Sequence, residues 1–320
     1  MKKTLLALTT GFMLAVGTCS AAYPEKPITI TVPFPPGGST DMLARILTPK
    51  MQERLGQPVI VENKPGATGA IGATQVKRAA PDGYNILCAS IGVWVANPFL
   101  QKNLGYDPAK DFDLLTVAVK SPNVLVVNPN VPAKDVAELV AYLKQKPGKV
   151  TFPSSGAGSS DHLSIALFWQ STGTSGIHVP YKGGGPAIAD LVAGHAEASF
   201  QNINNVIGHI KAGKLKALAT TGDKRSTLLP DTPTLLELGY KEMVVTSWQA
   251  YAAPKGLPAD VKKAIHGAMV AALKDPDTAK KLTDPGFEIT ASTPEEFSTF
   301  LNSELARWKK VIEVGKITLD

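Results

Sequence analysis

The feature that most limits how this chain can fold is a short unit that recurs along it: an apolar strand, a glycine-rich turn and a helix. The first copy comprises an alternating strand at 28–32, the turn Pro33-Phe-Pro-Pro-Gly-Gly-Ser39 and an amphipathic helix that reaches Leu55. Strands that alternate with helices at this spacing pair in parallel through right-handed crossovers. The recurring unit therefore predicts an α/β fold.

Further copies of the unit predict two lobes. Between the early and late copies, the segments 113–119 and 123–128 are strand-like, with Ser121-Pro122 at the join, and 243–251 is a second segment of this kind. We interpret these segments as two crossings between lobes. We expect 23–120 plus 248–320 in lobe 1 and 121–247 in lobe 2, with a cleft at the carboxyl ends of the strands. The further copies begin with strands at 59–62, 85–89, 150–152, 177–180 and 196–200.

Two helices carry clear local signals. Pro49 lies inside the first helix, and because an interior proline costs about 3 kcal/mol in a helix, we expect a kink or an early break near Thr48. The last helix has a capping box, with Thr293 as N-cap, Pro294 in the first helical position and Glu296 three residues after the cap. This pattern predicts that the final helix begins at Pro294.

Residues 1–22 have the pattern of an export signal. Lys2 and Lys3 precede an apolar stretch, and Ser20-Ala-Ala22 is a small-residue cleavage site. We therefore expect cleavage near Ala22 and a periplasmic protein. A retained anchor and lipidation of Cys19 are the alternatives, although Thr18 stands where a lipoprotein signal has Gly, Ala or Ser.

The charge of the chain excludes some partners. The formal net charge of the 320 residues is +6, and it falls by two without the leader, which carries Lys2 and Lys3 and no acid. Acids and bases are interspersed, so we expect no nucleic-acid partner. Cleavage would also remove Cys19 and leave Cys88 alone, which excludes an intramolecular disulfide. The sequence 85–90 around Cys88 is strand-like, and we expect this thiol to be buried.

The glycine turns are the candidate binding elements. Their residues are mostly small or polar, and charges are confined to Asp41, Lys64, Asp161 and Lys182. Glycine lets backbone N–H groups approach a ligand, and each turn opens a helix whose N-terminus favours negative charge. A purely geometric role explains any single turn, but several turns in two lobes predict an anion-binding cleft built largely from main chain.

Catalytic and cofactor templates fit poorly. The segment Gly208-His-Ile-Lys-Ala-Gly-Lys214 resembles a phosphate-binding loop, but Leu215 replaces the Ser or Thr that would reach magnesium. The five histidines are scattered and form no metal-binding motif, so we expect no metal and no cofactor. His178 is interpreted as a strand residue. His162 opens a helix, where capping and ligand contact are both open.

Taken together, several strings resemble the Bug or TctC-type extracytoplasmic solute receptors of tripartite tricarboxylate transporters. The resemblance covers nearly all of 23–320. The strings are Pro33-Phe-Pro-Pro-Gly-Gly-Ser-Thr-Asp41 with Ala44-Arg45, Val61-Glu-Asn-Lys-Pro-Gly-Ala-Thr-Gly-Ala-Ile-Gly72, Pro81-Asp-Gly-Tyr84, His178-Val-Pro-Tyr-Lys-Gly-Gly-Gly-Pro-Ala187 and His209-Ile-Lys-Ala-Gly-Lys214.

The resemblance implies a type II periplasmic-binding-protein fold that is not an enzyme. Such receptors hold a small carboxylate between two lobes and deliver it to integral membrane permease subunits. The expected ligand is a mono- or dicarboxylate, an aromatic acid or a related amide, and we expect a monomer. By motif, the expected contacts are Phe34, Gly37, Gly38, Ser39, Ala67, Thr68, Gly69, Ser90, Ser155, Gly158, Ser159, His162, Tyr181, Lys182, Gly183 and Asn202. Asp41 is expected to fix its turn.

One departure and two alternatives remain. Relatives often carry an acid where this chain has Gln201-Asn202, and this change weakens an amino-acid ligand assignment. An exported hydrolase or transferase on the same scaffold is the main alternative, because Ser159, Asp161 and His162 lie close in sequence. Neighbouring helix residues face different ways, which argues against a triad. A sensor that feeds a signalling partner is compatible with the same cleft.

Overall fold

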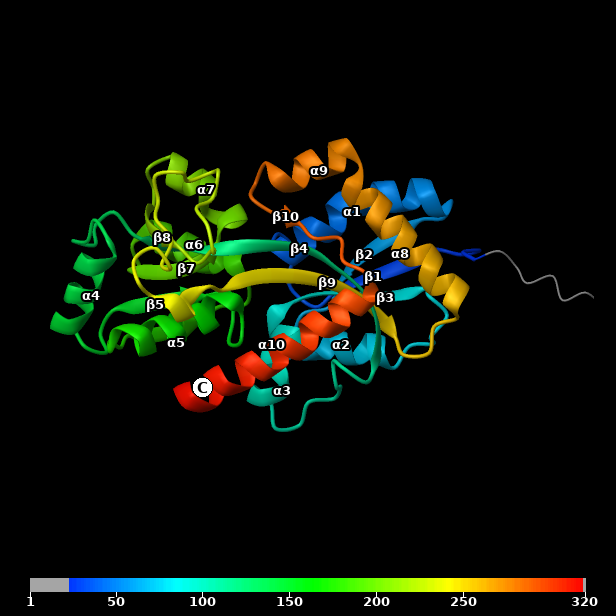
Figure 1. Ribbon diagram of the computed structural model, residues 1–320, viewed down its shortest axis with the longest axis horizontal. Coiled ribbons are helices and arrows are strands. Elements are labelled where there is room, and N and C mark those ends of the chain that lie inside the picture. The colour runs from blue at the N-terminus through cyan, green and yellow to red at the C-terminus, as the bar shows by residue number, and fades with distance from the viewer. Residues whose placement is uncertain (1–22, 319–320) are drawn as a thin grey trace, which may run out of the picture.

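The predicted units are present in both halves of the computed structural model, which describes residues 23–318 (Figure 1). The export segment 1–22 lies outside the described residues, so its prediction stays open. We call the first group of elements the first lobe. It comprises β1 (Ile28–Val32), α1 (Ser39–Leu55), β2 (Val59–Asn63), η1 (Ala67–Gly69), α2 (Ala70–Lys77), β3 (Asn85–Ser90), η2 (Gly92–Ala96), α3 (Asn97–Leu100), α8 (Ala259–Lys274), α9 (Pro276–Thr283), β10 (Glu288–Ile289) and α10 (Pro294–Gly315).

The second lobe lies beside the first and is built from the later copies of the unit (Figure 1). Its β5 and β6 pair in parallel, as β1 does with β2 and β3, which confirms the predicted parallel pairing for these strands. The later copy at 196–200 differs, because β7 pairs antiparallel with β4 (Phe112–Val127). Its elements are α4 (Val136–Gln145), β5 (Thr151–Ser154), α5 (Ser160–Thr172), β6 (Ile177–Pro180), α6 (Gly184–Ala193), β7 (Ala198–Asn202), α7 (Ile203–Lys211), β8 (Lys216–Thr220) and η3 (Lys241–Met243).

Two long strands, β4 (Phe112–Val127) and β9 (Thr246–Pro254), run from one lobe to the other (Figure 1). The two strand-like segments predicted on either side of Ser121-Pro122 form one continuous strand, β4. Its antiparallel pairing with β9 ends at Pro122, and its pairing with β7 begins at Asn123. The proline therefore lies where β4 changes partners, a position at which a missing N–H is tolerated.

The strands β4 and β9 join strands of both lobes in one sheet, while β5 and β6 form a separate two-stranded sheet. The order is β10-β4-β9-β3-β1-β2, and β7 and β8 pair with β4 at its other end. The helix α10 packs along β4 and also reaches α5 of the second lobe. Its predicted capping box is confirmed: the Thr293 hydroxyl accepts from Glu296 N–H at 3.1 Å, and the Glu296 carboxylate accepts from Thr293 N–H at 2.8 Å.

The first helix differs from its prediction. α1 runs without a break from Ser39 to Leu55, so the early end expected near Thr48 was wrong. Leu43, Leu47 and Met51 on its buried face are fully enclosed. Burial of these side chains, each of which contributes about 1.5–3 kcal/mol, offsets the cost of the interior Pro49.

Buried side chains gather on both faces of the shared sheet. One cluster runs through both lobes under β4 and β9 and includes Trp94, Trp248 and Trp308, while each lobe has a smaller cluster on the opposite face. Cys88 is fully buried, as predicted, and burial raises the pKa of its thiol to about 12. No helix within 23–318 is both long and apolar enough to span a bilayer.

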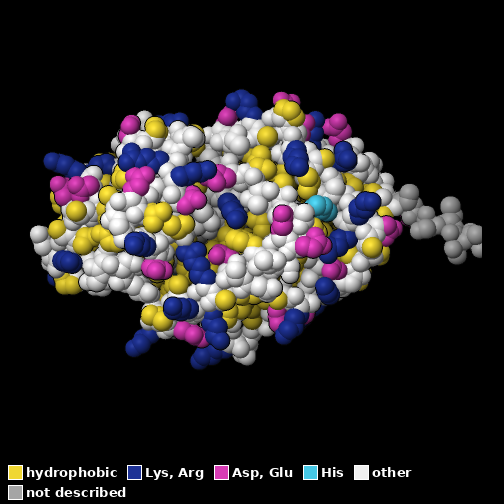
Figure 2. Space-filling model, viewed as in Figure 1, with side chains coloured by type: hydrophobic (Ala, Val, Ile, Leu, Met, Phe, Trp, Pro, Cys, Tyr) yellow, Lys and Arg dark blue, Asp and Glu magenta, His cyan; other side chains and the backbone are white. Residues whose placement is uncertain are grey.

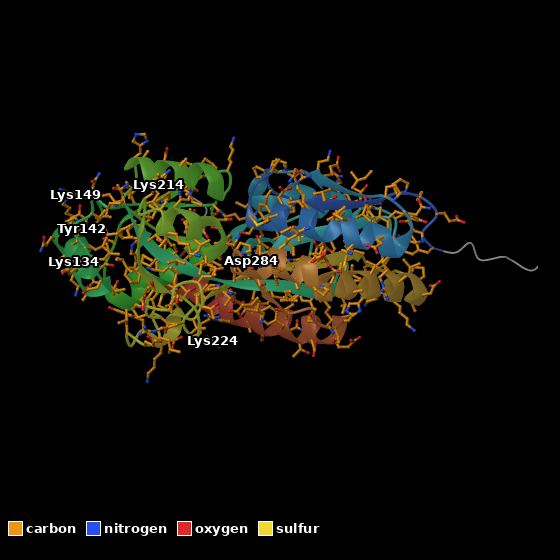
Figure 3. All side chains as sticks on the ribbon, turned by 90° about the horizontal axis from the view of Figure 1, so that it is seen from above. Lys134, Tyr142, Lys149, Lys214, Lys224 and Asp284 are labelled. Atoms are coloured by element: carbon orange, nitrogen blue, oxygen red, sulfur yellow. The ribbon has the colours of Figure 1, made fainter. Side chains whose placement is uncertain are left out.

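The surface carries both signs of charge. Basic and acidic side chains are interspersed over the face shown in Figure 2, as the sequence predicts. The exposed side chains of Lys134 and Lys149 lie at the end of the second lobe that is far from the first (Figure 3). The charged groups of this region therefore lie away from the junction of the lobes.

Candidate functional site

The glycine turns of both lobes converge on one cavity of about 600 Å³, at the carboxyl ends of their strands. Its size is typical of small-molecule sites. Every predicted contact except His162 lines this cavity; whether each touches a ligand stays a prediction. The predicted residues that line it are Phe34, Gly37, Gly38, Ser39, Ala67, Thr68, Gly69, Ser90, Ser155, Gly158, Ser159, Tyr181, Lys182, Gly183 and Asn202.

Helix N-termini surround the cavity. The N-cap residues of α1, α5, α6 and α7 all line it: Gly38, Ser159, Gly183 and Asn202. Of these four, only the Ser159 side chain caps its own helix. The N-cap residues of the other three helices leave the first-turn N–H groups without a side-chain cap. The positive ends of all four helix dipoles therefore face the cavity. This arrangement favours an anion.

In the first lobe, Asp41 anchors the loop that precedes α1. Its carboxylate accepts from Gly37 N–H at 2.9 Å, from Arg45 Nε at 3.0 Å and from Asn63 Nδ2 at 2.9 Å. Burial alone would raise the pKa of Asp41, but these three donors outweigh it and hold the pKa below its usual value. The predicted role of Asp41 in fixing the turn is confirmed.

In the second lobe, Asp161 anchors the loop that precedes α5, but no cation of the described residues pairs with it. Its carboxylate accepts from Ser155 N–H at 2.9 Å, from the Ser155 hydroxyl, and from Ser160 Oγ at 3.3 Å. No lysine or arginine of 23–318 forms an ion pair with it. Burial raises the pKa of Asp161, which favours its neutral form.

His162 lies behind this loop and, unlike the other predicted contacts, does not line the cavity. Its Nδ1 accepts from Gly158 N–H at 3.0 Å, and its ring stacks on His178 with a centroid distance of 3.8 Å. The ring of His178 shares a hydrogen bond of 2.7 Å with Ser154 Oγ. Burial lowers the pKa of His162 to about 3 and that of His178 to about 4, and His178 also disfavours a charge on His162. Both rings are therefore neutral supports of the loop.

A strained turn forms another part of the first-lobe wall. Ala67 and Thr68 are not glycines, yet their φ angles are 45° and 51°. Asn97 and Gln101 stabilise this left-handed turn: Asn97 Nδ2 donates to Thr68 O at 3.2 Å, and Gln101 Nε2 donates to Ala67 O at 3.0 Å. Strain of this kind persists where surrounding contacts over-determine it, often at functional sites.

The two lobes touch beside the cavity. Ser39 Oγ donates to Asn202 Oδ1 at 3.0 Å and accepts from Asn204 Nδ2 at 2.8 Å. A Cβ atom on Gly92 of the first lobe would lie 2.8 Å from the carbonyl oxygen of Gly158 in the second. Glycine at position 92 therefore permits this close approach of the two backbones.

The lining residues include two aspartates and one lysine: Asp41, Asp161 and Lys182. Lys182 is the one cation among the lining residues within 23–318, and it is exposed at the rim. Tyr181, its neighbour, donates its hydroxyl to the Asp190 carboxylate. No group of three or more His, Cys, Asp or Glu side chains that could hold a metal occurs among the described residues.

Some wall residues lie outside the glycine turns, and the sequence analysis missed them. Ser247 and Gln249 of β9 line the cavity, and β3 places Ser90 directly opposite Gln249. Their signal was present in the sequence: two polar residues at a spacing of two within an otherwise buried strand lie on one face. Polar residues on a buried strand are also compatible with a purely structural role, so this pattern alone does not indicate a cavity wall.

The family model described as "Tripartite tricarboxylate transporter family receptor" matches residues 43–317. The chain belongs to this family. This receptor is 36% identical over 318 residues to BugT of Bordetella pertussis, with 98% of each chain covered. The Rhodopseudomonas palustris protein Rpa4515, solved with adipate, matches with a TM-score of 0.89 at 33% identity, covering 92% of this chain and 99% of that one. MatC of the same species, solved with malate, has a TM-score of 0.86 at 31% identity, with 91% and 100% covered.

These matches confirm the predicted family and its periplasmic-binding-protein fold. Members of the family are transporter receptors, which bind a solute rather than transform it. The geometry around Ser159 agrees with this role. The hydroxyl of Ser159 accepts from His162 N–H at 3.3 Å as a helix cap, while the His162 ring is bonded to Gly158 instead.

Proposed function

We propose that this receptor captures a small organic carboxylate between its two lobes in the periplasm and delivers it to membrane-embedded partner proteins. The observation that carries the proposal is the convergence of four helix N-termini on one cavity. Family membership supports delivery to membrane partners, for which integral permease subunits are the expected class. The export pattern at 1–22, with cleavage near Ala22, supports a periplasmic location.

The ligand class follows from size and charge. Relatives of this receptor were solved with adipate and with malate, both small carboxylates. A cavity of about 600 Å³ accommodates a mono- or dicarboxylate, an aromatic acid or a related amide. The carboxyl end of β7 carries no acidic side chain, because Gln201 and Asn202 are its last two residues, and this argues against an amino acid.

Magnitudes favour closure of the lobes around the ligand. A helix N-terminus stabilises an anion by about 0.3–1 kcal/mol, or up to about 2 kcal/mol when partly buried, and a hydrogen bond to a charged group contributes about 1.5–3 kcal/mol. Micromolar binding requires about 8 kcal/mol. Three or four such hydrogen bonds reach this value only where water is excluded and little ordering is needed, which two preformed lobes that close together achieve.

The proposed hinge is the pair of crossing strands. We propose residues 23–120 plus 248–320 as one lobe and 121–247 as the other, since β4 exchanges β9 for β7 and β8 next to this boundary. The hydrogen bonds of Ser39 with Asn202 and Asn204 would form on closure. We propose a monomer, because one chain contributes both walls of the cavity.

A ligand panel tests the proposal. We would titrate residues 23–320 with dicarboxylates, aromatic acids, amino acids, amides and neutral sugars, and record thermal unfolding. A ligand at 100 times its dissociation constant stabilises the folded state by about 2.7 kcal/mol, which gives a clear shift in Tm. We expect shifts with acids. Shifts with sugars alone would overturn the carboxylate assignment, and turnover that is lost in Ser159→Ala would establish the hydrolase alternative.

A further inference from the structure

The crossing strand β9 places a polar pair at the cavity, although most of its neighbours are apolar. Ser247 and Gln249 lie two positions apart, so their side chains share one face of β9, and both line the cavity. Trp248 between them faces the other side, where its Nε1 donates to Glu304 of α10 at 3.2 Å. Gln249 is 0% exposed and Ser247 is 1% exposed. The pair is therefore fixed by the strand and almost closed to bulk solvent.

The hydrogen bonds of this pair are incomplete. Gln249 Nε2 donates to Ser247 Oγ at 3.1 Å, while Gln249 Oε1 is buried and accepts no hydrogen bond from any residue of 23–318. Ser247 Oγ is the acceptor of this bond, so its own O–H can still donate. The pair thus presents one acceptor and one donor side by side. A buried amide oxygen without a donor is unfavourable, so a ligand that supplies one gains affinity there.

The second lobe contains a similar Ser–Gln pair that differs from the β9 pair in its position relative to the cavity. Ser199 and Gln201 of β7 also lie two positions apart, and both are fully buried. Gln201 Nε2 donates a hydrogen bond to Ser199 Oγ at 2.9 Å. Gln201 Oε1, like Gln249 Oε1, has no hydrogen-bond donor among the described residues. Neither Ser199 nor Gln201 lines the cavity. Ser199 donates its own hydroxyl to Pro153 O. Of the two pairs, only the β9 pair lines the cavity, so substitutions in the β7 pair serve as matched controls for the binding experiments.

We propose that Ser247 and Gln249 form a subsite for a second polar group of the ligand, one that both donates and accepts a hydrogen bond: a hydroxyl or a primary carboxamide. This inference rests on the proposed function, in which the helix N-termini hold a carboxylate. The N–H of a carboxamide donates to Gln249 Oε1, and its oxygen accepts from the Ser247 hydroxyl. A second carboxylate only accepts, so it places negative charge against Gln249 Oε1.

Isosteric ligand pairs test the subsite. Isothermal titration of residues 23–320 would compare adipate with its monoamide, succinate with its monoamide, and succinate with malate, which differs by one hydroxyl. In the wild type we expect the monoamide or the hydroxy acid to bind about 10- to 100-fold more tightly than its partner, in at least one size class. Gln249→Met removes the acceptor at similar volume and should abolish this preference. Gln201→Met should keep it.

The outcomes separate the two ideas. Equal binding of all pairs, tighter binding of the plain dicarboxylates, or a preference that survives Gln249→Met would overturn the subsite and leave the receptor function intact. If no carboxylate or monoamide binds, the proposed function fails and the subsite fails with it. The order of ligand affinities in the wild type requires no variant, so it tests the subsite even where Gln249→Met does not fold. A bound monoamide whose nitrogen lies about 3 Å from Gln249 Oε1 in a crystal would confirm the assignment.

Discussion

The two lobes anchor equivalent cavity loops in different ways. The first lobe uses an ion pair, because the buried Asp41 carboxylate is reached by Arg45, whose side chain is 52% exposed. In the second lobe, burial shifts the pKa of Asp161, His162 and His178 toward their neutral forms. An arginine at the lobe surface can reach Asp41, whereas Asp161 has only hydroxyl and amide donors. Equivalent loops can thus be anchored with an ion pair or without one.

The largest expected effect of this difference is on acid stability. Both histidines have lowered pKa values, so between about pH 3 and pH 6.5 the unfolded chain binds protons that the folded protein does not. The free energy of unfolding should therefore fall as the pH is lowered through this window, by about 2 kcal/mol for each histidine from pH 7.5 to pH 5.

Urea unfolding at both pH values would measure this loss in the wild type and in the double variant His162→Gln/His178→Gln. The variant should lose less stability on acidification, whatever its stability at pH 7.5. Because Asp161 is present in both proteins, its opposite pH dependence cancels in the difference. Equal losses in the two proteins would show that these rings do not titrate as the structure implies.

The next largest effect is expected on ligand affinity, when the contact between the two lobes at Gly92 is disturbed. In Gly92→Ala, the added Cβ would lie 2.8 Å from Gly158 O, so the lobes could not approach as closely. Overpacking of this kind costs about 1–3 kcal/mol, and we expect carboxylate binding to weaken about 10- to 100-fold. Calorimetric titration measures this. The control is Gly267→Ala in α8, which does not line the cavity and where a Cβ meets nothing within 4 Å; a similar loss in both variants would refute the closure argument.

A smaller effect is expected when Asp41 and Asp161, which anchor the two loops, are each replaced by asparagine and the losses of stability are compared. Asp41→Asn removes a charge that holds charge-assisted hydrogen bonds, so it should lower the free energy of unfolding at pH 7 by about 2 kcal/mol. Asp161→Asn removes a charge that burial already disfavours and keeps an acceptor for Ser155, so it should cost less than about 1 kcal/mol. Denaturant titration ranks the two. The reverse order would mean that Asp161 is ionised in the folded protein.

The smallest effect is expected at the rim. Lys182→Gln removes the one cation among the lining residues of 23–318, but this side chain is exposed and screened by salt. Carboxylate affinity should fall about threefold or less at physiological ionic strength, and by a larger factor in dilute buffer. A loss above about tenfold at physiological salt would show that side-chain charge, rather than main chain, dominates recognition.

Sequence reasoning succeeded where the signal was local. The alternation of strands with glycine turns predicted the parallel pairs, and the capping box at Thr293 predicted the start of α10, because both depend on residues close together in the chain. It did not anticipate that α1 continues through Pro49 without a break, or that the segments on either side of Pro122 form one strand. Burial of one face of α1 and the change of strand partners along β4 are long-range effects that local propensity does not contain.

For the site, the sequence by itself determined which turns could present backbone N–H groups, and all of those turns line the cavity. Only the tertiary structure decided the rest: it placed the His162 ring behind the loop, brought Ser39 to Asn202 across 163 positions, and added Ser247 and Gln249 to the wall. The physical reason is that backbone conformation follows from neighbouring residues, whereas the direction in which a side chain meets a cavity depends on how distant elements pack together.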